Sequence, residues 1–213
     1  MTPLLEFVLA HLPPQPARVL EVGCGEGELA RALGAAGYDL LAIDPRAPEG
    51  PIFRQIKLEE LDEAERFDAV VASRVFHHVA HLDSSLARVA CMLDGGPFVL
   101  DEFAWDWLDD TTAEWYESQR RVLLAAGREP RGPSADEWEH HHHGRHVVHG
   151  AATLRGAVER NFVGQFEDVP YLWRYLGGEA SLALEEGLIA AGAIRPLGFR
   201  FVGIPRGAAT LET

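Results

Sequence analysis

The stretch VLEVGCGEGEL, residues 19–29, constrains the fold of this chain more than any other. A short apolar run that contains Glu21 is followed by Gly23, Gly25 and Gly27, and an amphipathic pattern begins directly after them. Glycine adopts positive φ values without steric cost and lets the backbone approach a ligand closely. Three glycines between a strand and a helix therefore predict the first strand-to-helix crossing of an open parallel sheet, beside which ligands bind.

Up to Glu102, apolar runs alternate with helical patterns. Strands are expected at 18–22, 39–43, 51–56, 67–72 and 97–101, and helices at 26–36 and 83–93. Strands joined by helices at this pace predict parallel strands that are covered by helices. The chain is therefore expected to form a doubly wound, Rossmann-like α/β domain.

Beyond Glu102 this rhythm changes. A helix is expected from a cap at Asp110 or Thr111 to about Ala126, and a capping box at Ser134 and Glu137 opens a further helix. The remaining elements are expected at 152–161 and 179–191 for helices and at 162–167 and 199–204 for strands.

These elements predict a single domain over residues 1–213 with a seven-stranded, mostly parallel sheet whose last strand is antiparallel. Residues 15–102 form its ligand-binding half. A helical insert at about 103–160 is expected to cover the open end of the sheet, and C-terminal strands and a helix follow at about 161–205.

Composition excludes several classes of protein. The formal net charge is −14, which repels a phosphate backbone and argues against nucleic acid as a partner. No apolar run reaches the ~20 residues of a membrane helix, and the first residues lack the basic leader of a secretory signal. Only Cys24 and Cys91 occur, without partner spacing, so we expect a reducing, cytoplasmic location and no membrane association.

The spacing of the glycines argues against a dinucleotide. That fingerprint is G-x-G-x-x-G, but here the sixth position from Gly23 is Glu28, and the third glycine, Gly27, comes one residue early. Glu26 and Glu28 also stand where phosphates would lie. The pattern disfavours a nicotinamide oxidoreductase and favours a ligand without phosphates that has a cationic end.

The stretch resembles the first motif of the class I S-adenosylmethionine-dependent methyltransferases, an acid followed by G-C-G-x-G. The matching residues here are Glu21, Gly23, Cys24, Gly25 and Gly27. The resemblance extends over residues 15–102 and is closest to the small-molecule branch often grouped as type 11 or 12. It implies S-adenosylmethionine as the cofactor.

The same resemblance assigns further cofactor contacts. Asp44, after the second strand, matches the acid that binds both ribose hydroxyls. Glu59 or Glu60 matches the position near the adenine, with Leu58 beside the ring. Ser73, in the fourth-strand motif, completes the expected set of cofactor-binding residues.

His77 and His78 follow the fourth strand, where this fold presents groups to the transferred methyl. A histidine there can deprotonate an oxygen or nitrogen nucleophile at neutral pH, so both are candidate catalytic residues. The alternative is that one of them only packs beneath the cofactor. Methyl transfer often depends more on proximity and desolvation than on a base.

The run His140–His143 invites a metal interpretation, with His146 and His149 nearby. Gly144 interrupts the helix that would align them and no carboxylate completes a metal triad, so we expect a polar pocket wall and no metal. Aromatic residues also gather beyond the cofactor motifs, mostly as core and some as pocket lining. They are Trp105, Trp107, Trp115, Tyr116, Trp138, Tyr171, Trp173 and Tyr175.

The predicted function is methyl transfer from S-adenosylmethionine to a small molecule by direct in-line displacement, which releases S-adenosylhomocysteine. The N-P-P-Y stretch of enzymes that methylate adenine or glutamine amino groups is replaced here by residues 73–76, SRVF. The alternative is a non-catalytic S-adenosylmethionine-binding module, a sensor or carrier, on the same fold. The acceptor, the methylated atom and the oligomeric state stay open.

Overall fold

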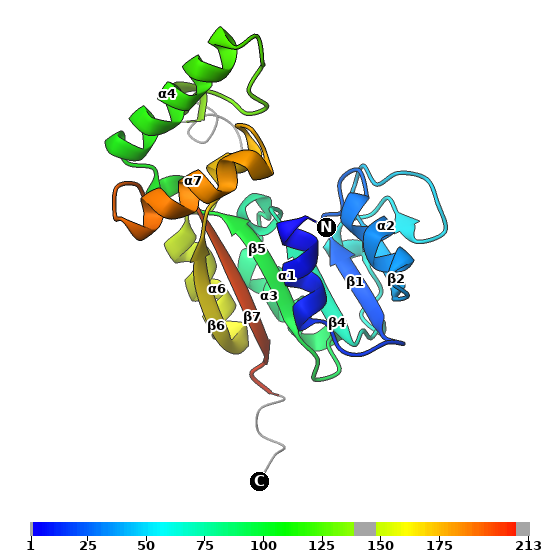
Figure 1. Cartoon of the computed structure of the whole chain (residues 1–213). Helices are drawn as coiled ribbons and strands as arrows, with labels where there is room; N and C mark the ends of the chain where they lie inside the picture. Colours follow the sequence, from blue (N-terminus) through cyan, green and yellow to red (C-terminus); the bar gives the residue numbers. More distant parts are fainter. Residues whose placement is uncertain (1, 139–147, 208–213) are drawn as a thin grey trace. The chain divides into compact units, whose positions relative to one another are not determined.

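A computed structural model of the chain describes residues 2–138 and 148–207. Its sheet has seven strands in the order β3-β2-β1-β4-β5-β7-β6 (Figure 1). The strands are β1 Arg18–Val22, β2 Asp39–Ile43, β3 Phe53–Arg54, β4 Ala69–Ser73, β5 Phe98–Phe103, β6 Phe162–Val169 and β7 Gly198–Pro205. The pairs β1–β2, β2–β3, β1–β4 and β4–β5 are parallel.

Helices connect most of these strands. The α-helices are α1 Pro3–His11, α2 Glu28–Ala35, α3 Leu82–Met92, α4 Asp110–Ala125, α6 Ala151–Asn161 and α7 Glu179–Ala190. Short 3-10 segments are η1 Leu58–Glu60, η2 Phe76–His78, η3 Trp105–Trp107 and η4 Leu172–Arg174.

The last strand reverses direction. The N–H of Ala104, just after β5, donates to the carbonyl of Leu197, just before β7 (2.8 Å). At the other end of β7, the N–H of Arg206 donates to the carbonyl of Asn161, just before β6 (3.0 Å). The start of β7 thus lies beside the end of β5, which confirms the predicted mostly parallel, seven-stranded α/β fold.

The described residues fall into two compact units. The first comprises residues 2–102, 152–166 and 200–207, and the second 103–138, 148–151 and 167–199. The second unit begins where the sequence rhythm changes. The predicted division into a ligand-binding half, a covering insert and a C-terminal part stays a prediction.

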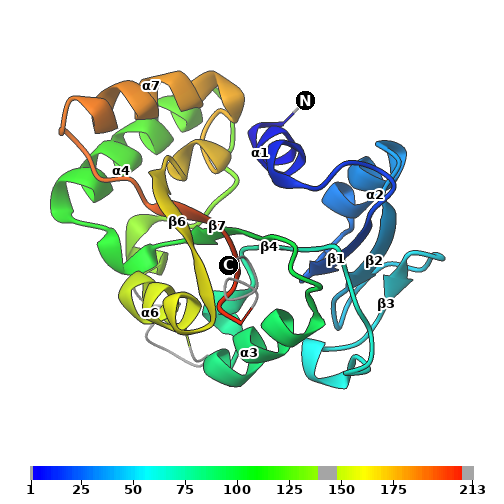
Figure 2. The same cartoon turned by 90° about the horizontal axis from the view of Figure 1, so that it is seen from below.

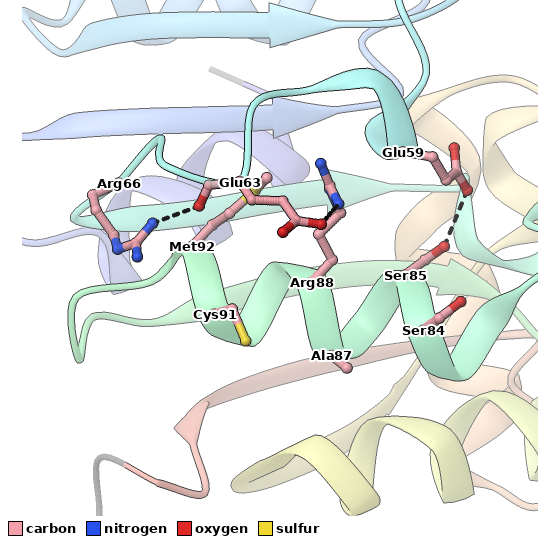
Figure 3. A pocket seen from close by; sticks show the side chains of 9 residues that line it. All are labelled: Glu59, Glu63, Arg66, Ser84, Ser85, Ala87, Arg88, Cys91 and Met92. Carbon is pink, nitrogen blue, oxygen red and sulfur yellow. Dashed lines mark hydrogen bonds and ion pairs between the residues drawn. The ribbon is translucent and has the colours of Figure 1, made fainter.

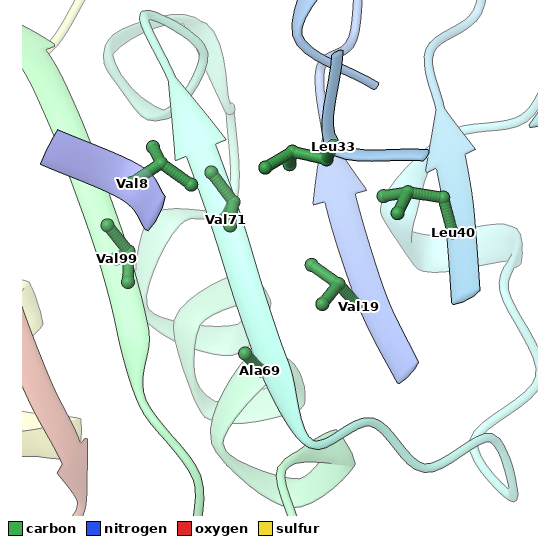
Figure 4. Close-up of a cluster of buried hydrophobic side chains, with 7 residues drawn as sticks. All are labelled: Val8, Val19, Leu33, Leu40, Ala69, Val71 and Val99. Carbon is green, nitrogen blue, oxygen red and sulfur yellow. The ribbon is translucent and has the colours of Figure 1, made fainter. Parts of the chain in front are cut away.

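The core of the first unit is built on both faces of the sheet. On one face, α1 and α2 cover apolar side chains that alternate along the strands, and α3 and α6 lie on the other face (Figure 2). The buried cluster that α1 and α2 form with the strands consists of Val8, Val19, Leu33, Leu40, Ala69, Val71 and Val99 (Figure 4). Burial on both faces explains why these strands are mostly apolar.

The second unit has an aromatic core. Its buried cluster consists of Phe103, Tyr116, Trp138, Tyr171, Leu172, Leu176 and Leu197. The rings of Tyr116 and Trp138 stack at 4.9 Å and those of Phe103 and Tyr171 at 4.3 Å. Of the aromatic residues noted in the sequence, Tyr116, Trp138 and Tyr171 are therefore core residues.

Several predicted boundaries differ from the structure. Helix α1 was not expected, although Thr2 caps it by accepting from the N–H of Leu5 (3.3 Å). Helix α4 is capped by Asp109, one residue before the expected cap. Helix α3 begins at Leu82, one residue before the expected start, with His81 at its N-cap. The capping box is present, since Ser134 and Glu137 exchange hydrogen bonds.

Candidate active site

The three glycines of the loop between β1 and α2 all have positive φ, +74° at Gly23, +50° at Gly25 and +77° at Gly27. A Cβ on Gly23 would lie 2.5 Å from Val75 Cγ2, and one on Gly27 would lie 2.5 Å from a ring carbon of Phe53. These two glycines are thus required both by their φ and by the close packing of other parts of the first unit.

Gly25 differs from its neighbours. Apart from Gly25 itself and its two chain neighbours, no atom of the described structure lies within 4 Å of the position that its Cβ would take. Open space beside a glycine with positive φ, between two glycines that are tightly packed, is the arrangement expected where a ligand passes close to the backbone.

Asp44 ties this loop to the end of β2. Its Oδ2 accepts from the N–H of Gly25 (3.2 Å), and its Oδ1 accepts from the N–H of Arg46 (2.7 Å). The carboxylate is only partly buried. Each oxygen retains a lone pair, so two adjacent hydroxyl groups can donate to it.

Glu21 lies in β1 directly beneath the loop and is 3% exposed. Within the described residues its Oε2 has no hydrogen-bond partner. Burial raises its pKa to about 8, aided by the charge of Asp44 and opposed by the N–H of Ala30. Burial likewise raises the pKa of the Cys24 thiol to about 12, so that thiol is not a nucleophile at neutral pH.

The expected adenine contacts lie in and beside η1. Leu58 is buried, whereas Glu59 and Glu60 are exposed. Glu60 caps η1, since its Oε2 accepts from the N–H of Lys57 (2.7 Å), and Glu59 accepts from the hydroxyl of Ser85 on α3 (3.1 Å). The carboxylate of Glu60 is thus used to cap η1, whereas that of Glu59 is not. Of these two candidates for the adenine contact, Glu59 is the one whose side chain has no capping role.

A groove of about 500 Å³ runs between the segment after η1 and helix α3 (Figure 3). It is lined by Glu59, Glu63, Arg66, Ser84, Ser85, Ala87, Arg88, Cys91 and Met92. An ion pair of Glu63 with Arg88 (2.7 Å) crosses it. Glu59 is the only expected cofactor residue in this lining, so the groove is not the site at the glycine loop.

Beyond β4, the structure separates the two candidate histidines. His77 is 5% exposed and His78 lies at the surface, with their ring centroids 4.0 Å apart. Nδ1 of His77 lies 2.7 Å from Oε2 of Glu102 at the end of β5. Glu102 is fully buried, and its Oε1 accepts from the N–H groups of Val75 (3.0 Å) and Phe76 (2.6 Å).

Sequence reasoning missed the role of Glu102. It treated this residue only as the end of a strand, because the partner loop lies about 25 residues upstream. The available signal was a pair of adjacent acids, Asp101 and Glu102, within an otherwise apolar strand, FVLDEF. A charge in a buried strand needs a hydrogen-bonded partner.

Ser73 lies at the end of β4, and its hydroxyl donates to Asp101 Oδ2 (3.3 Å). Asp101 also accepts from Nε of Arg200 (3.1 Å). Ser73 thus belongs to a polar network between neighbouring strands, and its expected cofactor contact stays a prediction.

The run His140–His143 and His146 lie outside the described residues. Within the described part of the chain, no group of three His, Cys, Asp or Glu side chains is placed to hold a metal ion. His149 is described, and its carbonyl accepts from Nε1 of Trp105 (3.2 Å). No helix of residues 2–138 and 148–207 is both long and apolar enough to cross a membrane.

A doubly wound sheet with a glycine loop after β1, an acid after β2 and a buried acid beneath the loop defines the class I methyltransferase fold. The chain belongs to that family: the family described as "Methyltransferase domain" matches residues 1–161. This confirms the predicted family of S-adenosylmethionine-dependent enzymes. The narrower type 11 or 12 branch stays a prediction.

Curated relatives and solved structures are similar to the chain. It is 32% identical over 163 residues to ubiquinone biosynthesis O-methyltransferase of Bradyrhizobium sp. (strain ORS 278), covering 57% of this chain and 64% of that protein. It is 39% identical over 101 residues to the mitochondrial ubiquinone biosynthesis O-methyltransferase of Mus musculus, covering 38% and 27%. The chain therefore matches less than two thirds of the length of these relatives.

Among solved structures, an S-adenosylmethionine dependent methyltransferase from Mesorhizobium loti superposes with a TM-score of 0.61 at 20% identity. The match covers 96% of each chain. At this identity the likeness concerns the fold, which agrees with the predicted seven-stranded sheet.

Proposed function

We propose that this chain transfers a methyl group from S-adenosylmethionine to a small-molecule acceptor. The observation that carries the proposal is the unpartnered carboxylate oxygen of buried Glu21, beneath a loop with open space at Gly25. The cofactor supplies a methyl group on a positively charged sulfur and has a cationic ammonium at one end. A buried acid without a full set of donors fits such a cation.

The roles of the other residues follow from their places. Gly23 and Gly27 hold the loop in shape, and Gly25 admits the cofactor's amino-acid end. Asp44 holds the ribose with the oxygens that already fix the loop. Leu58 and Glu59 bound the adenine.

Ser73 and Cys24 are the more peripheral members of the proposed set. Ser73 contributes through the end of β4, and Cys24 through the backbone of the loop, where its N–H donates to the carbonyl of Ile43 (3.1 Å). Mutation of either is expected to affect cofactor binding less than mutation of Asp44.

The acceptor proposed here is a small molecule that carries a hydroxyl group. The curated relatives are named O-methyltransferases, and the net charge of −14 disfavours nucleic acid. We further propose a reducing, cytoplasmic environment, because Cys24 and Cys91 are both free thiols.

Calorimetric titration with S-adenosylhomocysteine tests the cofactor site, with NAD as the control ligand. Micromolar binding of S-adenosylhomocysteine alone is expected. Replacing Asp44 by Ala should weaken it by about 1–3 kcal/mol, or roughly 5- to 150-fold, because charge-assisted hydrogen bonds are lost. Asp39→Ala is the matched control, since this acid begins the same strand and its side chain is 76% exposed.

A screen of hydroxylated small molecules for methyl transfer tests the reaction itself. Methylation of at least one compound, with release of S-adenosylhomocysteine, is expected. Folded protein that binds neither ligand would overturn the whole proposal. Tight S-adenosylhomocysteine binding without turnover of any acceptor would instead favour the non-catalytic binding module.

A further inference from the structure

The pairing of His77 with Glu102 is not explained by cofactor binding alone. The carboxylate is fully buried, the imidazole is 5% exposed, and Oε2 and Nδ1 are 2.7 Å apart. The other carboxylate oxygen, Oε1, already holds the N–H groups of Val75 and Phe76. The acid is therefore anchored by the backbone, and its remaining oxygen sets the orientation of the ring.

The hydrogen-bond chemistry of the pair determines which nitrogen is available. An ionised carboxylate only accepts hydrogen bonds, so Nδ1 of His77 carries the ring proton that it donates to Glu102. In the neutral ring, Nε2 then keeps its lone pair. This arrangement leaves Nε2 as a base whose direction is fixed by a buried acid.

The pair is connected to the cofactor loop by direct packing. A Cβ on Gly23 would lie 2.6 Å from Cβ of Val75, and the N–H of Val75 is held by Glu102. The turn that bears His77 thus lies against the glycine loop within the first unit. His78, at the surface, is the poorer candidate because its neighbour already occupies the buried carboxylate.

We propose that His77 is the general base of the reaction and that Glu102 is its positioning residue. This inference rests on the proposed function and names the acceptor class: a hydroxyl group that is protonated at neutral pH. A phenolic hydroxyl, with a reference pKa of about 10, is such a group. It must lose its proton to become a strong nucleophile.

Nε2 of His77 takes the hydroxyl proton while the acceptor oxygen forms a bond to the methyl carbon. The carbon–sulfur bond breaks, and its electron pair stays on the sulfur of the thioether product. Glu102 stabilises the imidazolium until its Nε2 proton passes to solvent.

The first test reads the ring directly and needs no acceptor. In uniformly ¹⁵N-labelled protein, long-range ¹H–¹⁵N correlations should show His77 protonated on Nδ1 and unprotonated on Nε2 at neutral pH. His77→Gln identifies the resonance, and His81→Gln, which removes an exposed histidine, is the control. In Glu102→Gln the amide donates to Nδ1, so the proton should move to Nε2.

The second test measures turnover, with catechol as the first probe and the screened hydroxyl compounds after it. His77→Gln and Glu102→Gln should each lower kcat by about 10²- to 10⁴-fold, the usual contribution of a general base. Their affinity for S-adenosylhomocysteine should be unchanged. His81→Gln should keep the wild-type kcat.

Two results would overturn the inference. One is a wild-type His77 ring that is protonated on Nε2 at neutral pH. The other is turnover that survives His77→Gln but is lost in His78→Gln. A failure of the wild-type protein to bind S-adenosylhomocysteine would overturn the proposed function instead, so the two failures are distinguishable.

Discussion

Glu102 in the first unit and Glu185 in the second are both fully buried, and each holds the start of a 3-10 turn. Oε1 of Glu185 accepts from the N–H groups of Tyr171 and Leu172, and its Oε2 accepts from that of Trp173 (2.6 Å). In Glu102, Oε1 accepts from backbone N–H groups, whereas Oε2 lies beside Nδ1 of His77. A buried glutamate therefore caps a 3-10 turn in both units. Glu185 bonds only backbone N–H groups in these contacts, whereas Glu102 also contacts the imidazole of His77.

Glu21 extends this comparison. It is also buried, but one of its oxygens has no partner in the described part of the chain. A buried acid with an unpartnered oxygen is costly to ionise, and burial raises the pKa of Glu21 accordingly. The three glutamates thus range from a purely structural cap, through an acid that positions a base, to an acid that still lacks a cationic partner.

The largest effect is expected from Glu185→Ala. The substitution leaves three backbone N–H groups without an acceptor in the aromatic core, so the free energy of unfolding should fall by about 4–6 kcal/mol. Urea denaturation followed by tryptophan fluorescence measures it.

The matched control is Glu186→Ala, the exposed neighbour on the same helix. It should change the free energy of unfolding by less than about 0.5 kcal/mol. Equal effects of the two substitutions would show that Glu185 is not a cap and would remove the basis of the comparison with Glu102.

A smaller, pH-dependent effect is expected at Glu21. Its folded-state pKa is about 8, against an ordinary value of 4.5. Below pH 4.5 the carboxyl group of Glu21 is neutral in both the folded and the unfolded protein. Its burial then does not lower the free energy of unfolding, and the fold keeps its full stability there. As pH rises toward 8 the unfolded state ionises first, and the folded state loses stability relative to it.

Glu21→Gln removes this titration and should therefore be more stable than the wild type at alkaline pH. The difference should grow through the pH window from 4.5 to about 8, by at most about 1.4 kcal/mol per pH unit. Denaturation of the ligand-free proteins at several pH values measures it. Parallel stability curves for the two proteins would mean that Glu21 is ionised in the fold.

Local patterns in the sequence predict much of the first unit. Periodicity gave the five parallel strands between Arg18 and Phe103, and the glycine spacing located the loop above Glu21. These features depend on residues that are close in sequence. Asp44 was singled out by the resemblance to the methyltransferase family, and it contacts Gly25 only 19 residues away across adjacent strands.

The buried caps could not be predicted in this way. Glu185 lies in an ordinary helical stretch, LALEEGL, where Glu186 looks identical to it in pattern. Which of the two turns inward depends on η4, 12 to 14 residues upstream. Likewise, nothing local to Glu102 indicates that it meets His77, because that contact exists only once β4 and β5 pair.

The smallest effect on stability is expected from Glu102→Gln. The amide oxygen can still accept from the N–H groups of Val75 and Phe76, and the amide nitrogen can donate to His77. Charge-assisted bonds become neutral ones, so the free energy of unfolding should fall by only about 1 kcal/mol. The same urea titration measures it, beside that of Glu185→Gln.

Glu185→Gln should cost more, about 2–3 kcal/mol, because its amide nitrogen would then face the N–H of Trp173 with no acceptor between them. A glutamine that is tolerated at Glu102 but not at Glu185 would show that one carboxylate oxygen of Glu102 is not needed by the backbone. That oxygen is then available to orient His77. Equal costs at both positions would instead make Glu102 a structural cap like Glu185, with His77 as a packed neighbour.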